Sequence, residues 1–497
     1  MRNINIEELK KVIEPHFYSL LDQDIYEVKV VDSVLLLKYN RFDLAFKILY
    51  LEMLNYDTDF SKHVYIEHIR AFSLGEFTEP GNENKNGIGK FIEDFKIIFE
   101  NIQKNGFDPN QTLIPLSKNG SIVNGSHRVA SAIVLNRHVN CVEINSNDHI
   151  YDYQFFYDRN VPNTILDAVA TKFIEYAEDI YIALIWPTAV EKDEIIDKII
   201  PNVVYKKKIK LNPNGAHNLI SQIYYGEEWL GSIENNFGGA QSKVVECFKT
   251  FDSVRVIAFQ ATDLNEVLQI KQEIRDTFNI GKHSVHITDT KEEAIRTARI
   301  VFNANSIHFL NYAQPNKYIS THDKIEIFSR FIKKNNLFKE DLLLDSSLIL
   351  SLYGLREAKD IDFFIQDNSK VKYHFNQVEI HDKELKYHRE KKLELIYNQN
   401  FYFYFNDLKF ISFDQLYRMK KNRTETKDIN DCAMMEALIE NNKFKEMLNK
   451  VKQIIHYEKI KFRQTYFQFK QRVIEFLKII GLYNVLRAIY RKIRNRT

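Results

Sequence analysis

Two aspartates separated by a single residue stand out in the segment LDSSLILSLYGLREAKDIDFFI, which covers residues 344–365. On a β-strand, residues i and i+2 point to the same face, so Asp360 and Asp362 would present their carboxylates together. Paired carboxylates bind Mg²⁺ through oxygen, and such an ion bridges triphosphate oxygens during phosphoryl or nucleotidyl transfer. We therefore predict that Asp360 and Asp362 are catalytic residues and Mg²⁺ ligands.

Two serines precede this aspartate pair across a short segment with a helical pattern. The hydroxyl and backbone N–H groups of Ser346 and Ser347 could hold a phosphate. Three carboxylates further along the chain are candidates for a third metal ligand, and the sequence does not separate them: Glu379, Asp382 and Glu394.

This pattern resembles the nucleotidyltransferase superfamily of the antibiotic-modifying and antitoxin-paired kind, in which Gly-Ser, a helix and a [D/E]-x-[D/E] strand follow one another. Residues 413–432, FDQLYRMKKNRTETKDINDC, are similar to the downstream helix pair of that family. The resemblance implies that five residues contact the nucleotide or fix the two helices: Lys420, Arg423, Lys427, Asp428 and Asp431. Asp345 stands where the family usually has Gly, and its carboxylate could repel a triphosphate or change the role of the site. The alternative is a degenerate fold that only binds or scaffolds.

A second polar group, Asn124-Gly125-Ser126-His127-Arg128, lies between an apolar strand and a helix that begins near residue 129. Glycine lets the backbone approach a ligand closely, and the first N–H groups of a helix attract anions. Ser126 adds a hydroxyl, and Arg128 can bind phosphate with two N–H groups. His127 could donate to the phosphate or transfer a proton. The alternative is a tight turn whose arginine forms a surface ion pair.

Residues 113–144 resemble the ParB/sulfiredoxin-like fold, in which an apolar strand leads into a [D/N]-G-x-H-R motif and an alanine-rich helix. The matching segment here is VNGSHRVASAI. The resemblance implies that Asn124, Gly125, Ser126 and Arg128 hold the phosphates of ATP or CTP, with His127 in a catalytic role. Ser126 stands where the sulfinic-acid reductase has its nucleophilic cysteine, which argues against reductase chemistry.

Composition and charge narrow the class of protein. The chain has 497 residues, which suggests about three domains, and 44% of them are hydrophobic. A net charge of +2 and the lack of a basic recognition helix give no reason to expect nucleic acid as a partner. The three cysteines are isolated, which argues against a zinc ribbon or a disulfide framework and for a reducing cytoplasm. No apolar run is long enough to span a bilayer.

We predict a multi-domain α/β and α+β protein with four parts. They are a helical lead-in and ParB/sulfiredoxin-like domain over 1–150, a central α/β domain of unknown role over 151–320, a nucleotidyltransferase-like domain over 321–445 and a helical tail over 446–497. Alternating strand and helix patterns over 253–311, with a last strand at 306–311, predict an α/β layer in the central part.

The C-terminal end, residues 481–497, has an apolar face interleaved with basic residues. The apolar residues at helical spacing are Leu482, Val485, Leu486, Ile489 and Ile493, and the basic ones are Arg487, Arg491, Lys492, Arg494 and Arg496. A basic amphipathic helix is typical of contact with a membrane surface. This end resembles the tails of bacterial glycan-assembly transferases that work at the inner leaflet. An ordinary terminal helix packed on its domain is the equal alternative.

Both recognisable modules resemble families that handle nucleotide phosphates, and the combination is similar to bacterial proteins of surface-polysaccharide gene sets. We therefore expect a cytoplasmic enzyme, peripheral to the inner membrane if the tail binds lipid. It would transfer a phosphoryl or nucleotidyl group from Mg²⁺-bound ATP or CTP to a sugar or other small precursor of a surface glycan. The alternatives are a glycosyl- or polyol-phosphate transferase of capsule assembly and a non-catalytic nucleotide-binding scaffold.

Overall fold

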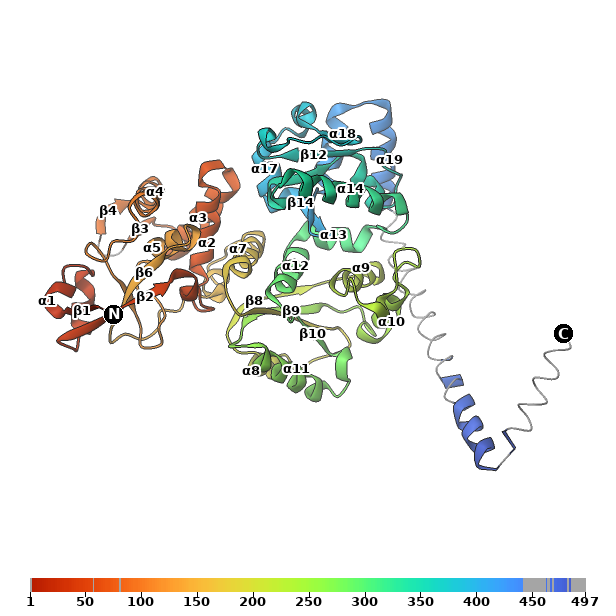
Figure 1. Cartoon of the computed structure of the whole chain (residues 1–497), viewed down its shortest axis with the longest axis horizontal. Coiled ribbons are helices and arrows are strands. Elements are labelled where there is room, and N and C mark those ends of the chain that lie inside the picture. The colour runs from red at the N-terminus through yellow and green to blue at the C-terminus, as the bar shows by residue number, and fades with distance from the viewer. Residues whose placement is uncertain are drawn as a thin grey trace. The chain divides into compact units, whose positions relative to one another are not determined.

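The computed structural model describes residues 2–56, 58–79 and 82–440, and from the C-terminal part residues 462, 465, 466, 469–480, 482 and 483. The chain forms two compact units, Met1–Glu436 and Ala437–Thr497. The first unit contains three sheets of four or five strands, each with its own set of helices (Figure 1). This agrees with the expected multi-domain mixture of helices and strands.

The N-terminal part is built on a sheet with the strand order β1-β2-β6-β5. Its strands are β1 (Arg2–Asn5), β2 (Ile25–Asp32), β5 (Ile114–Leu116) and β6 (His138–Glu143). Strands β5 and β6 are parallel and are connected through α5 (Ser126–Val134), which begins inside the Asn124–Arg128 motif. The other longer helices are α2 (Asp43–Glu52), α3 (Asp59–Phe72) and α4 (Ile88–Asn105).

The central part has a fully antiparallel sheet with the strand order β10-β7-β9-β8. Its strands are β7 (Ile180–Ile185), β8 (Val203–Ile209), β9 (Val254–Gln260) and β10 (Val285–Ile287). Helix α8 (Asp193–Ile199) connects β7 to β8, and α11 (Leu264–Phe278) connects β9 to β10. Two such β-α-β units in this strand order make a ferredoxin-like arrangement. The helices α9 (Pro213–Ile223) and α10 (Gly238–Cys247) are inserted between the units.

The sequence-based expectation for residues 306–311 is wrong, because they belong to helix α13 (Ala304–Tyr312) rather than to a strand. The side chain of Asn303 accepts a hydrogen bond from the Ser306 N–H at 2.9 Å, which starts the helix. Ser306, Phe309 and Leu310 are buried, and this spacing of three and four residues is helical. A short apolar run of this kind is compatible with a strand or a helix, and here the cap at Asn303 and the buried positions determine a helix.

One hydrophobic core runs through the N-terminal and central parts. Phe46 and Ile114 belong to the same buried cluster as Leu184 and Val256. Helices α7 (Asn163–Tyr176) and α12 (Lys291–Val301) pack together between the sheets of these parts. The predicted boundary near residue 150 therefore separates two sheets that share a core.

The third part has a mixed five-stranded sheet with the order β13-β12-β11-β15-β14. Its strands are β11 (Leu342–Asp345), β12 (Ile361–Ile365), β13 (Val378–Ile380), β14 (Tyr402–Phe405) and β15 (Leu408–Ile411). Its main helices are α14 (Ile319–Asn335), α15 (Ser347–Leu352), α17 (Lys392–Tyr397), α18 (Phe413–Arg423) and α19 (Thr426–Glu440). Strands β11 and β12 are antiparallel and flank α15, as the Ser-Ser, helix and Asp-x-Asp pattern predicts.

The described residues of the second unit include a helical segment over 469–479. Within the part of the chain that the structure describes, we find no helix that has both the length and the hydropathy needed to cross a bilayer. The basic tail predicted over 481–497 lies outside the described residues, except for Leu482 and Tyr483.

Candidate functional site

Three acidic residues line up across three neighbouring strands of the third sheet. Asp345 at the end of β11 is paired in register with Asp362 on β12, and Asp362 is paired with Glu379 on β13. Directly paired residues of adjacent strands place their side chains on the same face of a sheet. Asp345 and Asp362 are buried, whereas Glu379 is exposed. The strand register thus brings Glu379 to the Asp-x-Asp strand.

Hydrogen bonds distinguish the three candidates for a third metal ligand. Asp382 accepts hydrogen bonds from Asn368 at 2.8 Å and from Lys392 at 3.0 Å. Glu394 is buried and accepts from the backbone N–H groups of Asp59 and Phe60 at the start of α3. Since both carboxylates are engaged in structural contacts, Glu379 is the candidate that the fold places beside Asp362.

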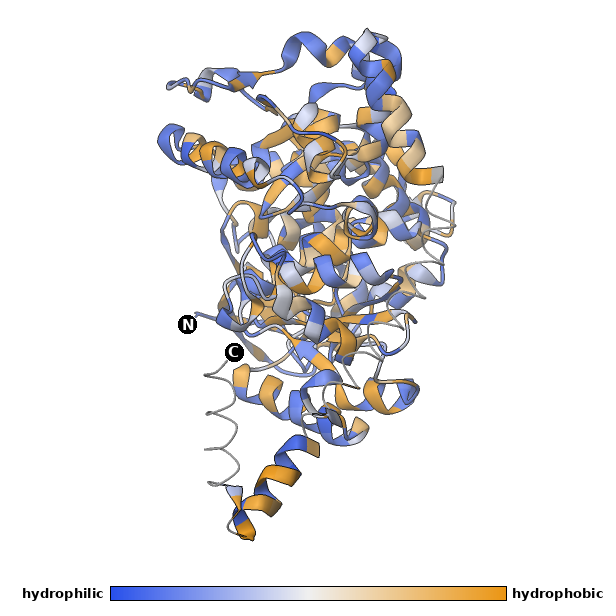
Figure 2. Ribbon diagram, turned by 90° about the vertical axis from the view of Figure 1, so that its right-hand side faces the viewer, coloured by the Kyte–Doolittle hydropathy of each residue, from blue (hydrophilic) through white to orange (hydrophobic). Residues whose placement is uncertain are grey.

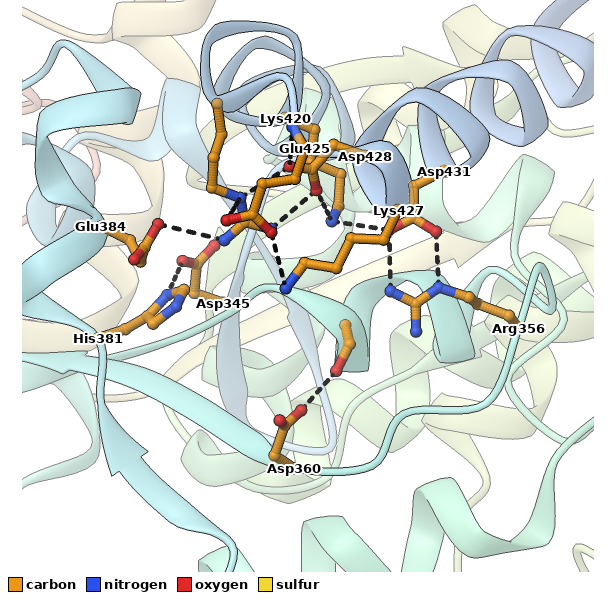
Figure 3. A network of polar contacts seen from close by, with 12 residues as sticks. Asp345, Arg356, Asp360, His381, Glu384, Lys420, Glu425, Lys427, Asp428 and Asp431 are labelled. Atoms are coloured by element: carbon orange, nitrogen blue, oxygen red, sulfur yellow. Dashed lines mark hydrogen bonds and ion pairs between the residues drawn. The ribbon is translucent and has the colours of Figure 1, made fainter.

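Asp360 lies just before β12 and is exposed. The Ser347 hydroxyl at the start of α15 donates to Asp360 Oδ1 at 3.0 Å (Figure 3). Two of the predicted site residues are therefore in direct contact. This contact also means that a cation or phosphate held by Asp360 or Ser347 would replace or share their hydrogen bond.

Asp345 is fully buried and does not present its carboxylate as the sequence suggested. Its Oδ2 lies 2.7 Å from His381 Nδ1 (Figure 3) and 3.3 Å from His388 Nε2. Burial alone would raise the pKa of Asp345, but the charge of His388 and the hydrogen bonds of both histidines outweigh it and hold the pKa far below its usual value. The histidine pair thus engages Oδ2, whereas the buried Oδ1 has no hydrogen-bond partner among the described residues. Neither histidine was singled out in the sequence, because nothing in their spacing relates them to Asp345.

Ser346 has φ 66° and ψ −131°, a backbone region that is adopted almost only by glycine. The conformation that favours glycine therefore occurs beside Asp345 rather than at it. A non-glycine residue in this region costs about 1–3 kcal/mol, which the surrounding structure must offset. Such strain is commonly found at functional sites, so its presence at the turn between β11 and α15 is notable.

Asp362 carries an excess of nearby negative charge. Burial is the largest cause of its raised pKa, about 6, and the carboxylates of Asp360 and Asp345 raise it further against the opposing effect of His381. A bound cation would relieve this repulsion, and carboxylate oxygens are the ligands that Mg²⁺ prefers. Asp360, Asp362 and Glu379 thus fit a Mg²⁺ site by donor type and strand position. However, no three His, Cys, Asp or Glu side chains among the described residues are already grouped to hold a metal ion.

The charged side chains of α18 and α19 form an internal network (Figure 3). Lys420 is almost fully buried, and its Nζ lies 3.1 Å from Asp428 Oδ1 and 2.8 Å from Asp431 Oδ2. Arg423 binds Asp428 through two N–H groups at 2.8 Å each, and Arg356 binds Asp431 at 2.6 and 2.8 Å. Of the two roles implied by the nucleotidyltransferase resemblance, these contacts correspond to fixing the two helices.

Lys427 differs from these residues because its side chain is exposed. Its Nζ lies 3.1 Å from Glu425 Oε2, and an exposed ion pair of this kind holds a side chain weakly. Lys427 therefore remains available for a nucleotide, and its predicted role stays a prediction.

The Asn124–Arg128 motif forms the expected turn before a helix. Gly125 has φ 88° and immediately precedes α5. A Cβ at this position would lie 2.7 Å from Ile114 Cδ1 and 2.9 Å from Arg128 Nη2, so the ends of these two side chains would have to move, and the positive φ itself favours glycine. Arg128 Nη2 donates to Glu14 Oε1 at 2.8 Å, and Nη1 donates to the Thr112 hydroxyl. Arg128 thus has the ion pair of the structural alternative, and a phosphate would have to compete with Glu14.

His127 is half-buried in this module and is held by two aromatic side chains. Its Nε2 is 2.9 Å from the Tyr65 hydroxyl, and its ring packs edge-on against Phe95. Burial lowers its pKa well below the usual value, and the charge of Lys47 acts in the same direction. A neutral histidine bonded to a buried tyrosine favours a structural role over the predicted catalytic one. Ser126 and Asn124 remain half-buried at the turn.

Two cavities lie away from the predicted residues. One, of about 670 Å³, is lined by side chains from all three parts of the first unit, among them Lys172, Arg299 and Lys409. The other, of about 520 Å³, shares Arg299 and Tyr404 with the first. Arg299 pairs with Glu175 at 2.8 Å and with Glu340 at 3.0 Å, so it connects the central and third parts. Sequence reasoning missed these residues, because each is an ordinary charge on a different helix or strand.

Comparisons of the chain with protein-family models, with curated proteins and with solved structures return no significant match.

Proposed function

We propose that the third part of the first unit is a nucleotidyltransferase that acts on a nucleoside triphosphate with Mg²⁺. The observation that carries this proposal is the alignment of Asp362 with Glu379 on adjacent strands, with Asp360 two residues before Asp362. The antiparallel β11 and β12 that flank α15, with Ser347 on Asp360, add to it.

In this proposal Asp360, Asp362 and Glu379 hold the cation, which would neutralise charge on the triphosphate and the leaving pyrophosphate. A hydroxyl of the acceptor would lose its proton to water and attack the α-phosphorus, the bond from this phosphorus to the oxygen that bridges to the β-phosphate would break, and pyrophosphate would leave. Ser347 would orient Asp360. Lys427, whose side chain is exposed on α19, would contact the phosphates. The acceptor would be a sugar or other small precursor of a surface glycan, as the sequence-based expectation has it. The reaction would take place in the cytoplasm, where nucleoside triphosphates are present.

Nucleotidyl transfer can be tested by following pyrophosphate release from each nucleoside triphosphate with Mg²⁺ and a panel of sugars and polyols. The Asp362→Asn variant should lose activity by roughly a hundredfold or more, because metal ligation is worth several kcal/mol in the transition state. Asp414→Asn is a matched control, since Asp414 is an exposed carboxylate of the same part, 65% accessible, on α18. Equal activity of wild type and Asp362→Asn would contradict the proposal.

A second candidate is a nucleotide-binding scaffold without turnover. Asp345 favours it, because a residue other than glycine stands in the first turn and its carboxylate is committed to His381 and His388. Nucleotide binding that depends on Asp362 without any pyrophosphate release would support this candidate over the enzyme. For the Asn124–Arg128 motif we keep the proposal of an ATP or CTP phosphate site, with the condition that Arg128 leaves Glu14.

A further inference from the structure

A helical segment of the second unit exposes a row of large apolar side chains. Over residues 469–480, Phe469 is 65% accessible, Phe476 is 61% accessible and Ile479 is 83% accessible. Val473 and Ile480 are exposed as well. Phe469, Val473, Phe476 and Ile480 follow one another at spacings of four, three and four residues, so they form one stripe of the helix. Along this helical segment the ribbon in Figure 2 alternates between hydrophobic and hydrophilic colours.

The same stripe begins earlier in the chain. Phe462 and Tyr466 are both exposed and helical, and they continue the spacing of four and three residues toward Phe469. Four of the six residues of this row are aromatic. Aromatic side chains are enriched where a protein meets the headgroup level of a bilayer, whereas the seam of a coiled coil favours Leu, Ile and Val.

The charge of this segment is strongly one-sided. Residues 462–480 contain four lysines and arginines against one glutamate, an excess of three positive charges, and residues 458–497 together carry an excess of nine. Since the whole chain carries a net charge of +2, residues 1–457 carry −7. Within the described helical segment, the exposed Lys470, Arg472 and Lys478 face a single acidic residue, Glu475. Two copies of this helix packed side by side would bring like charges together, which is unfavourable.

From the exposed aromatic stripe and the surrounding positive charge, we infer that the chain adsorbs to the surface of an anionic lipid bilayer through the described helical residues within 462–480. Its apolar stripe enters the boundary between headgroups and acyl chains, and its lysines and arginines contact lipid phosphates. Because no described helix can span a bilayer, this contact is peripheral. The inference concerns residues upstream of the basic end predicted over 481–497, and it does not depend on the proposed nucleotidyl transfer.

The test uses the full-length protein and vesicles of phosphatidylcholine, with and without anionic phosphatidylglycerol. We expect co-sedimentation with the anionic vesicles only, and its loss at high salt. The Phe469→Gln/Phe476→Gln variant should bind more weakly by roughly a hundredfold or more, because two large apolar side chains no longer enter the bilayer. Lys470→Gln/Arg472→Gln should weaken binding by about thirtyfold.

The matched control is Leu264→Gln/Leu268→Gln, which makes the same type of exchange at two exposed leucines of α11 in the first unit. It should bind as wild type does. The inference is overturned if wild type ignores anionic vesicles, or if the phenylalanine variant binds like wild type. Two further outcomes would also overturn it: a dimer that the phenylalanine exchanges dissociate, which would make a second copy the occupant, or binding to oligonucleotides but not to vesicles.

Discussion

Replacing Lys420 by methionine distinguishes a structural lysine from a nucleotide ligand. Methionine keeps most of the volume but removes the ammonium group that lies 3.1 Å from Asp428 and 2.8 Å from Asp431. Breaking a buried ion pair from one side costs about 3–5 kcal/mol, because a buried charge is left uncompensated. Here each carboxylate keeps an arginine, Arg423 or Arg356. We therefore expect the lower end, about 3 kcal/mol.

The assay is equilibrium unfolding in urea followed by far-UV circular dichroism. With a urea dependence of about 3 kcal/mol per molar, the midpoint should fall by about 1 M. The matched control is Lys421→Met, because Lys421 is the next residue, is 54% exposed and pairs with Glu436 at 3.1 Å. An exposed pair of this kind contributes about 0.5 kcal/mol. An unchanged midpoint for Lys420→Met, together with a loss of nucleotide affinity, would refute the structural role.

Three further predictions follow from the contacts of single residues. Glu394→Gln should lower the free energy of unfolding by about 1–3 kcal/mol, because it weakens the hydrogen bonds to the first N–H groups of α3. Glu379→Gln should leave the stability unchanged and weaken the Mg²⁺ dependence of nucleotide binding. The reverse pattern in urea unfolding and calorimetry would show that the metal ligand is misassigned. Burial lowers the pKa of His308 from 6.5 to about 4, so as the pH falls the unfolded chain binds a proton at this residue before the folded chain does. The free energy of unfolding should therefore be lower by about 2 kcal/mol near pH 5 than near pH 7. His308→Asn should remove this part of the pH dependence, and an unchanged pH profile of stability would contradict the assignment. Gly125→Ala should destabilise the protein by about 1–3 kcal/mol, because a residue with a side chain is strained at a φ of 88° and its Cβ would displace the ends of the Ile114 and Arg128 side chains. A urea midpoint equal to that of wild type would argue against this turn.

The local pattern of the third part was predictable because it depends on short-range signals. Strand β12, the short helix α15 and the Asp-x-Asp pair were predicted from the spacing within residues 344–365 and from the resemblance carried by that segment. The strained backbone of Ser346 was not predicted. The helices α18 and α19 contain the charged residues that the resemblance assigned to a downstream helix pair. The pairing of Asp362 with Glu379 could not be predicted from the sequence, because it depends on the register of β13, which begins 16 residues after Asp362.

Other features depend on contacts between segments far apart in the chain. The antiparallel sheet of the central part could not be inferred, since strand direction is decided by long-range pairing such as that of β7 with β9. The His381–Asp345 contact and the Arg128–Glu14 pair also join distant residues. The helix at residues 306–311 was missed because a short apolar run fits either period, and its cap at Asn303 decided the outcome.

The central claim is that Asp360 and Asp362 hold a Mg²⁺-bound nucleoside triphosphate. Its most direct test is calorimetric titration of ATP and CTP with Mg²⁺ into the full-length protein, the Asp360→Ala/Asp362→Ala variant and the Arg128→Ala variant. We predict Mg²⁺-dependent binding at the third part that the double aspartate variant loses and the Arg128→Ala variant retains; any binding at the Asn124–Arg128 motif should be lost in Arg128→Ala alone. Wild-type protein that binds neither nucleotide, or a double aspartate variant that binds as wild type does, would contradict the account.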